Sequence, residues 1–154
     1  MPDTNWYILT GPVQTGKTTS LLQGFRNRND LQGILTPVQN GSRVFMNIHT
    51  GEQFPMEALP GEKETLAVGR FHFSKSGFEK ATAVIRKAIH TAGWLIIDEI
   101  GPLELKGGGF HDVLQEVIAE RKGKTLLVVR EGLTATVQHQ FGFTASIRTD
   151  TGFI

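Results

Sequence analysis

Short apolar runs recur along the chain and are separated by polar stretches or by helix-like patterns. Runs of this kind predict β-strands, and the two most uniformly apolar runs predict strands that are buried on both faces of a sheet. The four clearest runs occupy residues 6–10, 31–36, 94–97 and 125–129.

Two longer stretches carry apolar residues at spacings of three, four and seven, which predict amphipathic helices. The first is residues 78–92, which follows a capping-box pattern at residues 76–79 and ends at Gly93. The second is residues 110–122, which ends at Gly123. Strands that alternate with helices in this way predict an α/β fold with a mainly parallel sheet and right-handed crossovers.

Residues 31–58 depart from this alternation. Asn40-Gly41 is a strong hairpin signal, and the strand that follows carries Val44, Met46 and Ile48 on one face at a period of two. A third short strand is expected at residues 53–57. The pattern predicts an antiparallel meander that extends the parallel core.

The remaining segments give weaker signals. Residues 67–73 are expected to form one strand with Gly69 inside it. A weak helix at residues 134–140 and a short strand at residues 144–148 are expected to end the chain. The whole sequence, residues 1–154, is therefore interpreted as one domain.

Composition excludes several classes of function. The chain has no cysteine, which excludes disulfides, thiolate catalysis and cysteine-based zinc sites. Sixteen basic residues against 15 acidic ones give a net charge of +1, with no signal for nucleic-acid binding or a polybasic membrane anchor. The first residues lack the features of a signal peptide. These features predict a soluble cytoplasmic protein whose oligomeric state the sequence leaves open.

The first predicted strand runs directly into the pattern G-x-x-x-x-G-K-[ST], which is typical of a phosphate-binding P-loop. Its glycines allow the loop to turn its N–H groups inward, and the helix that follows adds its first-turn amides. The lysine supplies a charge for the β- and γ-phosphates, and Thr18 offers a hydroxyl to Mg²⁺. A glycine-rich turn with an unrelated lysine is the alternative. The predicted phosphate-binding residues are Gly11, Pro12, Val13, Gln14, Thr15, Gly16, Lys17, Thr18 and Thr19.

Two carboxylates follow the predicted strand 94–97. Asp98 matches an acidic residue that holds Mg²⁺, and we expect its strand to lie beside the strand that enters the P-loop. Glu99 is placed to reach a water molecule that attacks the γ-phosphate, and Lys17 completes the charge around the phosphates. The alternative is a helix cap or a solvated acidic turn.

Three other nucleotide-binding classes share parts of these patterns. Residues 98–101 match the D-x-x-G of GTP-binding switch proteins, but residues 129–132 do not supply the N-K-x-D motif that reads guanine. A nucleotide or cofactor kinase stays open, although no acceptor pocket or arginine-rich lid is recognisable. An NTP-gated binding module also stays open, with the meander as its contact surface.

Residues 95–105 closely resemble the I-D-E-I-G-P-M-E-L signature of the thermophile-type, or cancer-related, nucleoside triphosphatase family. Residues 16–19, the strand from Gly33 to Thr36 before a hairpin, and residues 68–71 before a helix agree with the same family. The resemblance covers most of the chain, up to residue 130.

The resemblance implies a RecA-like, three-layer P-loop fold. It also implies slow, Mg²⁺-dependent hydrolysis of several NTPs, such as ATP and GTP, to the diphosphate and phosphate. It makes Glu99 the expected base and places Glu104 in the region of the site.

A phosphoryl-transfer site usually also has an arginine that stabilises developing charge. Arg130 is the first candidate, because it follows a strand that is predicted to be parallel to the one ending at Asp98. Arg70 and Arg43 are the next candidates.

Overall fold

The computed structural model describes residues 5–11, 17–25, 28–58, 60–63, 65–68 and 71–154. The strands are β1 (Trp6–Leu9), β2 (Leu31–Leu35), β3 (Val38–Gln39), β4 (Ser42–Asn47), β5 (Gln53–Pro55), β6 (Thr65–Val68), β7 (Phe71–Ser74), β8 (Trp94–Ile100), β9 (Lys124–Val129) and β10 (Ser146–Arg148). The helices are α1 (Lys17–Gly24), α2 (Lys75–Lys87), α3 (Pro102–Leu105), α4 (His111–Glu120) and α5 (Thr134–Phe141). None of these helices is long and apolar enough to cross a membrane.

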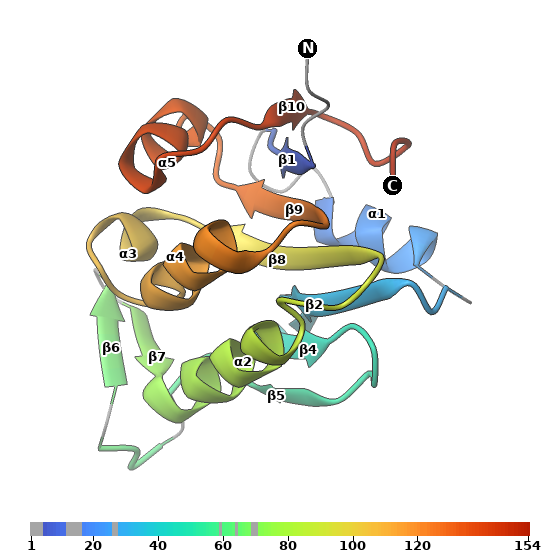
Figure 1. The fold of residues 1–154 in the computed structure, drawn as a ribbon. Helices are drawn as coiled ribbons and strands as arrows, with labels where there is room; N and C mark the ends of the chain where they lie inside the picture. Colours follow the sequence, from blue (N-terminus) through green and yellow to red (C-terminus); the bar gives the residue numbers. More distant parts are fainter. Residues whose placement is uncertain (1–4, 12–16, 26–27, 59, 64, 69–70) are drawn as a thin grey trace.

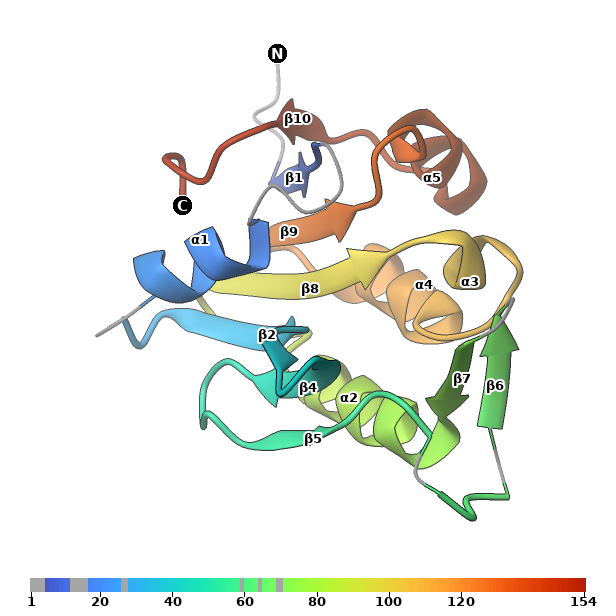
Figure 2. The ribbon, with the colours of Figure 1, turned by 180° about the vertical axis from the view of Figure 1, so that it is seen from behind.

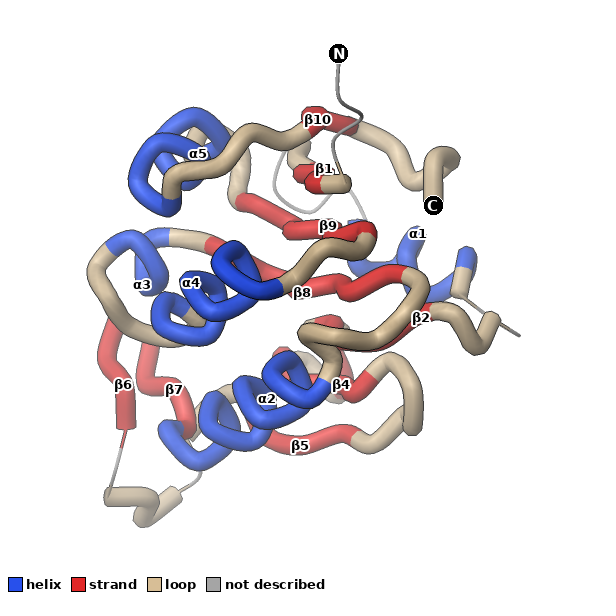
Figure 3. Tube along the Cα trace, in the orientation of Figure 1, coloured by secondary structure: helices blue, strands red, loops and turns tan. Residues whose placement is uncertain are grey.

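The main sheet, whose strands are drawn red in Figure 3, has a parallel part and an antiparallel part. Strands β10, β1, β9, β8 and β2 lie side by side in that order, and each neighbouring pair is parallel. Beyond β2 the sheet continues into β4, which pairs antiparallel with β2, β3 and β5. This arrangement confirms the mainly parallel sheet with an antiparallel hairpin extension, and β2 belongs to both parts.

Helices cover both faces of the sheet. Figure 1 shows α2 and α4 on one face, and the reverse view in Figure 2 shows α1 on the other. Successive residues of β8 alternate between the two layers: Leu95 and Ile97 pack into the cluster that includes α2 and α4, whereas Trp94 and Ile96 pack with α1. Burial on both sides explains why residues 94–97 of this strand are apolar without interruption.

The strand order corrects one expectation. β9 lies between β1 and β8, so the strand that ends at Asp98 does not neighbour the strand that enters the P-loop. The connection from β1 through α1 to β2 crosses two strand positions, and these are filled later in the chain by β8 and β9. Periodicity along the chain carries no information about this order.

The predicted hairpin is present, but its strand is buried differently. Asn40 and Gly41 both have positive φ angles, 51° and 81°, as a two-residue hairpin turn requires. The deepest side chain of β4 is Phe45, which is fully buried between Phe78 and Phe110 with ring centroids 4.9 and 5.8 Å away. Residues 46 and 48, which were expected to form the apolar face, are only half-buried against the opposite cluster.

The single strand expected at residues 67–73 is wrong. β6 and β7 pair antiparallel as a separate two-stranded sheet, with Val68 opposite Phe71. Gly69 was interpreted as the interior of a strand, but a glycine within an apolar run also marks the place where a strand ends. Gly69 itself lies outside the described residues.

Helix α2 begins and ends earlier than predicted. Its N-cap is Ser74, whose hydroxyl accepts a hydrogen bond from Gly77 N at 3.0 Å, so the capping pattern at residues 76–79 is not the helix start. The helix ends at Lys87, because the segment that follows turns toward β8 while Ala88 and Ile89 stay buried. The apolar stripe continues through these two residues although the helix does not.

One glycine sets the spacing between β2 and β8. Gly33 has φ +121° and lies opposite Ile96, and a Cβ at this position would overlap the Ile96 carbonyl oxygen. Only glycine meets both conditions. The close pairing that results brings the end of β2 next to the end of β8.

Candidate active site

Chemistry-bearing residues meet where the parallel strands end. α1 begins at Lys17, and in its first turn Thr18 Oγ1 donates a hydrogen bond to Asp98 Oδ2 at 2.8 Å. The start of α1 and the end of β8 are therefore in direct contact, although β9 separates β8 from β1 in the sheet. In parallel α/β sheets, this carboxyl edge is the usual place for a ligand.

Asp98 is buried and receives three hydrogen bonds on one oxygen. Besides the Thr18 hydroxyl, the main-chain N–H of Thr36 donates to Oδ2 at 3.1 Å and the Thr36 hydroxyl lies 3.2 Å from it. The other oxygen, Oδ1, is buried and has no hydrogen-bond partner among the residues that the structure describes. We refer to Thr18, Thr36 and Asp98 as the Asp98 cluster.

Burial raises the pKa of the Asp98 carboxyl above its ordinary value. The hydrogen bonds from Thr18 and Thr36 and the nearby charge of Arg43 lower that pKa, but by less than burial raises it. A buried carboxylate is stabilised further by a bound cation. The electrostatics of the Asp98 cluster are therefore suited to a bound cation.

The oxygen atoms of the Asp98 cluster match the ligands that a small divalent cation prefers. Mg²⁺ prefers oxygen ligands, and it is commonly held by one or two carboxylates together with substrate phosphates. Asp98 offers a buried oxygen without a partner. The Thr18 hydroxyl donates its hydrogen to Asp98, which leaves the lone pairs of its oxygen for a ligand bond.

Glu99 lies next to this cluster at an irregularity in the sheet. Asp98 pairs with Val128 and Ile100 pairs with Val129, so Glu99 stands at a bulge between them. Bulges commonly re-aim side chains near functional sites. The Glu99 side chain is half-buried, and its Oε1 lies near Gly101, 3.9 Å from the position of a Cβ there.

The structure shows fewer contacts for the other predicted site residues. Arg130 directly follows β9; its main-chain N–H bonds Ile100 O at 3.1 Å and its side chain is exposed. Thr19 is exposed in the first turn of α1, and Lys17 is described only as the first residue of that helix. The following predicted residues lie outside the described residues: Pro12, Val13, Gln14, Thr15, Gly16 and Arg70.

Thr36 was not predicted as a site residue. No motif marks it, and its place next to Asp98 follows only from the parallel pairing of β2 with β8. A polar residue at the end of a predicted parallel strand was the available signal, because such strands end at the same edge.

Glu104 braces the loop that follows Glu99. The side chain is buried, and its two oxygens accept hydrogen bonds from Gly101 N at 2.9 Å and Phe110 N at 3.0 Å. The carboxylate thereby ties the start of α3 to the start of α4. Within the site region, its contacts are those of a structural residue.

Burial raises the pKa of Glu104 from 4.5 to about 7. The folded protein therefore keeps this proton at pH values where the unfolded chain has released it. We expect the carboxyl's contribution to the free energy of unfolding to be complete below pH 4.5 and to be lost as pH rises through 7, by about 3 kcal/mol in total.

Urea unfolding of wild-type protein and Glu104→Gln across this pH range measures the effect. The amide does not titrate, so the stability of the wild type relative to the variant should decline as pH rises. A difference that stays constant with pH contradicts the assignment.

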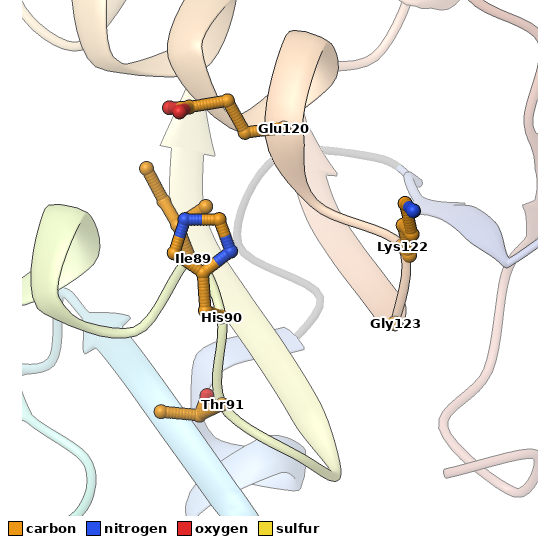
Figure 4. A pocket seen from close by; sticks show the side chains of 6 residues that line it. All are labelled: Ile89, His90, Thr91, Glu120, Lys122 and Gly123. Atoms are coloured by element: carbon orange, nitrogen blue, oxygen red, sulfur yellow. The ribbon is translucent and has the colours of Figure 1, made fainter.

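The opposite edge of the sheet holds a shallow pocket of about 390 Å³ (Figure 4). Its lining residues come from the segments just before β8 and β9, so it lies at the edge where these strands begin, away from Asp98. They are Ile89, His90, Thr91, Glu120, Lys122 and Gly123. The pocket is therefore separate from the candidate active site.

A buried arginine beside this pocket connects several elements through hydrogen bonds. Arg121 is 5% exposed, and its guanidinium donates from Nε to the Thr125 hydroxyl at 2.9 Å. Its two terminal nitrogens lie 2.9–3.0 Å from five carbonyl oxygens, those of Ala88, Ile89, Thr91, Gly93 and Lys124. One side chain thus joins the end of α2, the start of β8 and the start of β9.

A model of the NTPase family matches residues 6–149. The nucleoside-triphosphatase THEP1 of Methanopyrus kandleri is 29% identical over 138 residues, a match covering 80% of this chain and 72% of that protein. The protein of the same name from Thermococcus kodakarensis is 30% identical over 136 residues, covering 80% and 76%.

Two solved structures have the same fold. The solution structure of a human cancer-related nucleoside triphosphatase superposes with a TM-score of 0.68 at 22% identity, over 95% of this chain and 88% of that one. The crystal structure of THEP1 from the hyperthermophile Aquifex aeolicus gives a TM-score of 0.65 at 16% identity, over 96% and 90%. The expected α/β P-loop fold is confirmed.

Proposed function

This chain belongs to the NTPase family and is a nucleoside-triphosphate hydrolase, and we propose that it acts at the Asp98 cluster, depends on Mg²⁺ and accepts several bases. The observation that carries the proposal is the 2.8 Å hydrogen bond between Thr18 Oγ1 and Asp98 Oδ2. It joins the helix that follows the phosphate-binding pattern to the carboxylate at the end of β8.

In this proposal the phosphates bind along residues 11–19. The first-turn amides of α1 and the positive end of its dipole face an anion at this position. Lys17, the first residue of α1, adds a charge for the β- and γ-phosphates. Two features support the assignment: the sequence pattern, and the contact between the first turn of α1 and Asp98.

Mg²⁺ would be held by Thr18 and Asp98, where it supplies positive charge that offsets the charge of the β- and γ-phosphates. The unpartnered Oδ1 of Asp98 and the lone pairs of the Thr18 hydroxyl support this ligand pair. The protein's own residues would hold the substrate, place the attacking water and stabilise developing charge.

Glu99 accepts a proton from the attacking water, so an O–H bond of the water breaks. The water oxygen bonds to the γ-phosphorus, and the diphosphate leaves. Its position one residue after Asp98, at the bulge of β8, supports this role. Arg130 is proposed to stabilise charge on the transferred phosphoryl group, because its exposed side chain follows the strand beside β8.

Phosphate release from ATP, GTP, CTP and UTP tests the proposed function. We expect release from several of them with MgCl₂, and release at background level with EDTA, because the site lacks its cation there. Base tolerance is expected because no base-reading motif such as N-K-x-D follows β9. Tight nucleotide binding with no release in MgCl₂ would contradict hydrolysis at this site. Equal release in EDTA would contradict the metal dependence.

A further inference from the structure

The hydrogen bonds around Asp98 continue outward to an arginine on the antiparallel hairpin. Arg43, on β4, donates from Nη1 to the Thr36 carbonyl oxygen at 3.1 Å and to the Thr36 hydroxyl oxygen at 3.3 Å. Thr36 is itself 1% exposed and bonded to Asp98. Residues from β4, from the end of β2, from β8 and from α1 thus form one connected chain.

The chemistry of the donors fixes the direction of these hydrogen bonds. A guanidinium donates and does not accept, so the Thr36 hydroxyl oxygen accepts from Arg43. The hydroxyl hydrogen is then free to point at Asp98 Oδ2, 3.2 Å away. Hydrogen bonds in such a chain polarise and strengthen one another. Arg43 therefore sets the orientation of the Thr36 hydroxyl.

Three donors on Oδ2 hold the Asp98 carboxylate in one orientation. Two of the three come from Thr36, its N–H and its hydroxyl, and Thr18 supplies the third. Oδ1 is buried and receives no hydrogen bond from the described part of the chain. The consequence of this one-sided bonding is that Oδ1 stays available while the carboxylate cannot rotate without losing its partners.

The hairpin that carries Arg43 is itself fixed in the core. Phe45 follows Arg43 by two positions on β4 and is fully buried against Phe78 of α2 and Phe110. β4 also pairs directly with β2, the strand that ends just before Thr36. Arg43 is therefore presented to Thr36 from a rigid element.

We propose that Thr36 and Arg43 are positioning residues for the cation: Arg43 orients the Thr36 hydroxyl, and Thr36 holds Asp98 so that Oδ1 faces Mg²⁺. The inference rests on the proposed function, because it takes Asp98 as a cation ligand. It gives Arg43 a role different from that of an arginine that touches the transferred phosphate. Partners that orient a metal ligand commonly change metal affinity or activity by about 10–100-fold.

Metal affinity, measured without turnover, tests the inference. MgCl₂ is titrated into the protein saturated with a non-hydrolysable ATP analogue, and binding is followed by calorimetry. Thr36→Val removes the hydroxyl at nearly constant shape, and we expect the Mg²⁺ dissociation constant to rise by about 10–100-fold. Arg43→Gln, at an exposed side chain, should raise it by about 10-fold.

Conservative variants and a distant control separate positioning from general damage. Thr36→Ser keeps the hydroxyl, so its Mg²⁺ dissociation constant should stay within about threefold of the wild-type value. This change is smaller than the about 10–100-fold effect expected when such a partner is lost. Arg86→Gln removes an exposed guanidinium that bonds Glu116 on the α2–α4 side, and it should leave Mg²⁺ binding unchanged. Affinity for the nucleotide in EDTA should be the same in all of these proteins.

The outcomes distinguish this inference from the proposed function. If Asp98→Asn weakens Mg²⁺ binding while Thr36→Val and Arg43→Gln bind it as the wild type does, the inference is overturned and the cation site stands. If Asp98→Asn also binds Mg²⁺ normally, the cation site itself is wrong. Variants that bind nucleotide equally poorly with and without Mg²⁺ would assign Thr36 and Arg43 to the nucleotide pocket, which also overturns the inference.

Discussion

Replacing Glu99 with glutamine is expected to lower kcat for NTP hydrolysis by about 10²–10⁴-fold, while nucleotide binding is retained. The amide has nearly the same shape as the carboxylate but cannot take a proton from the attacking water. Binding should survive because the phosphate-binding residues and the Asp98 cluster are untouched. The experiment measures kcat and KM for hydrolysis and the dissociation constant of a non-hydrolysable ATP analogue with MgCl₂.

Glu120→Gln is a matched control for this variant, since Glu120 lies at the pocket on the opposite edge of the sheet. It should hydrolyse NTPs at the wild-type rate. Wild-type turnover by Glu99→Gln would show that another group serves as the base. A loss of nucleotide affinity equal to the loss of kcat/KM would instead give Glu99 a role in binding.

Replacing Arg121 with methionine is expected to lower the free energy of unfolding by about 4 kcal/mol. Each hydrogen bond from a charged donor contributes about 1.5–3 kcal/mol, and the variant leaves several carbonyl oxygens without a partner in a buried place. The loss is a large part of the about 5–15 kcal/mol that is typical of whole domains. In a chain of 154 residues it corresponds to a melting temperature lower by about 10 °C.

Two other variants bracket this result. Arg121→Lys keeps the charge but replaces three donor nitrogens with one, so it should recover only a minor part of the loss. Arg86→Met removes an exposed arginine and should cost about 1 kcal/mol or less. Urea unfolding of the three variants measures these values. If Arg121→Met is no less stable than Arg86→Met, the contacts at Arg121 do not hold the elements together.

The helices and strands that the sequence predicted best are those with the largest buried faces. The first four residues of β8 are all apolar because the strand packs on both sides, and α4 carries its apolar residues on the one stripe that packs against the core. Their presence and type follow from hydrophobic burial alone. The four-residue helix α3 was not predicted, since a segment this short has almost no periodicity to detect.

The phosphate-binding assignment stays a prediction, and it can be made from the sequence because its signal is local. Gly11 to Thr18 form one continuous sequence pattern, and Asp98 and Glu99 directly follow the apolar run 94–97 within β8. Their chemistry can be inferred without knowledge of strand order. The structure adds the contact between Thr18 and Asp98, which lie 80 positions apart.

The place of Thr36 in the Asp98 cluster could not be predicted, because it depends on a contact between residues that are distant in the sequence. Thr36 reaches Asp98 across 62 positions, through a pairing of β2 and β8 that requires Gly33. Arg43 was considered from the start, but only as one of several arginines. Its link to Thr36 depends on the fold of the hairpin.

The place of β9 has a consequence for how the protein is made. Among the described strands, β1 pairs with β9 and β10 alone, and both are synthesised long after it. While a ribosome is still translating the segment before Lys124, the strand that leads into the phosphate-binding pattern therefore has no sheet partner. β2, the hairpin and β8 can already pair at that stage. In a nascent chain the strands around Asp98 can thus pair first, and β1 joins them only when β9 has emerged between β1 and β8.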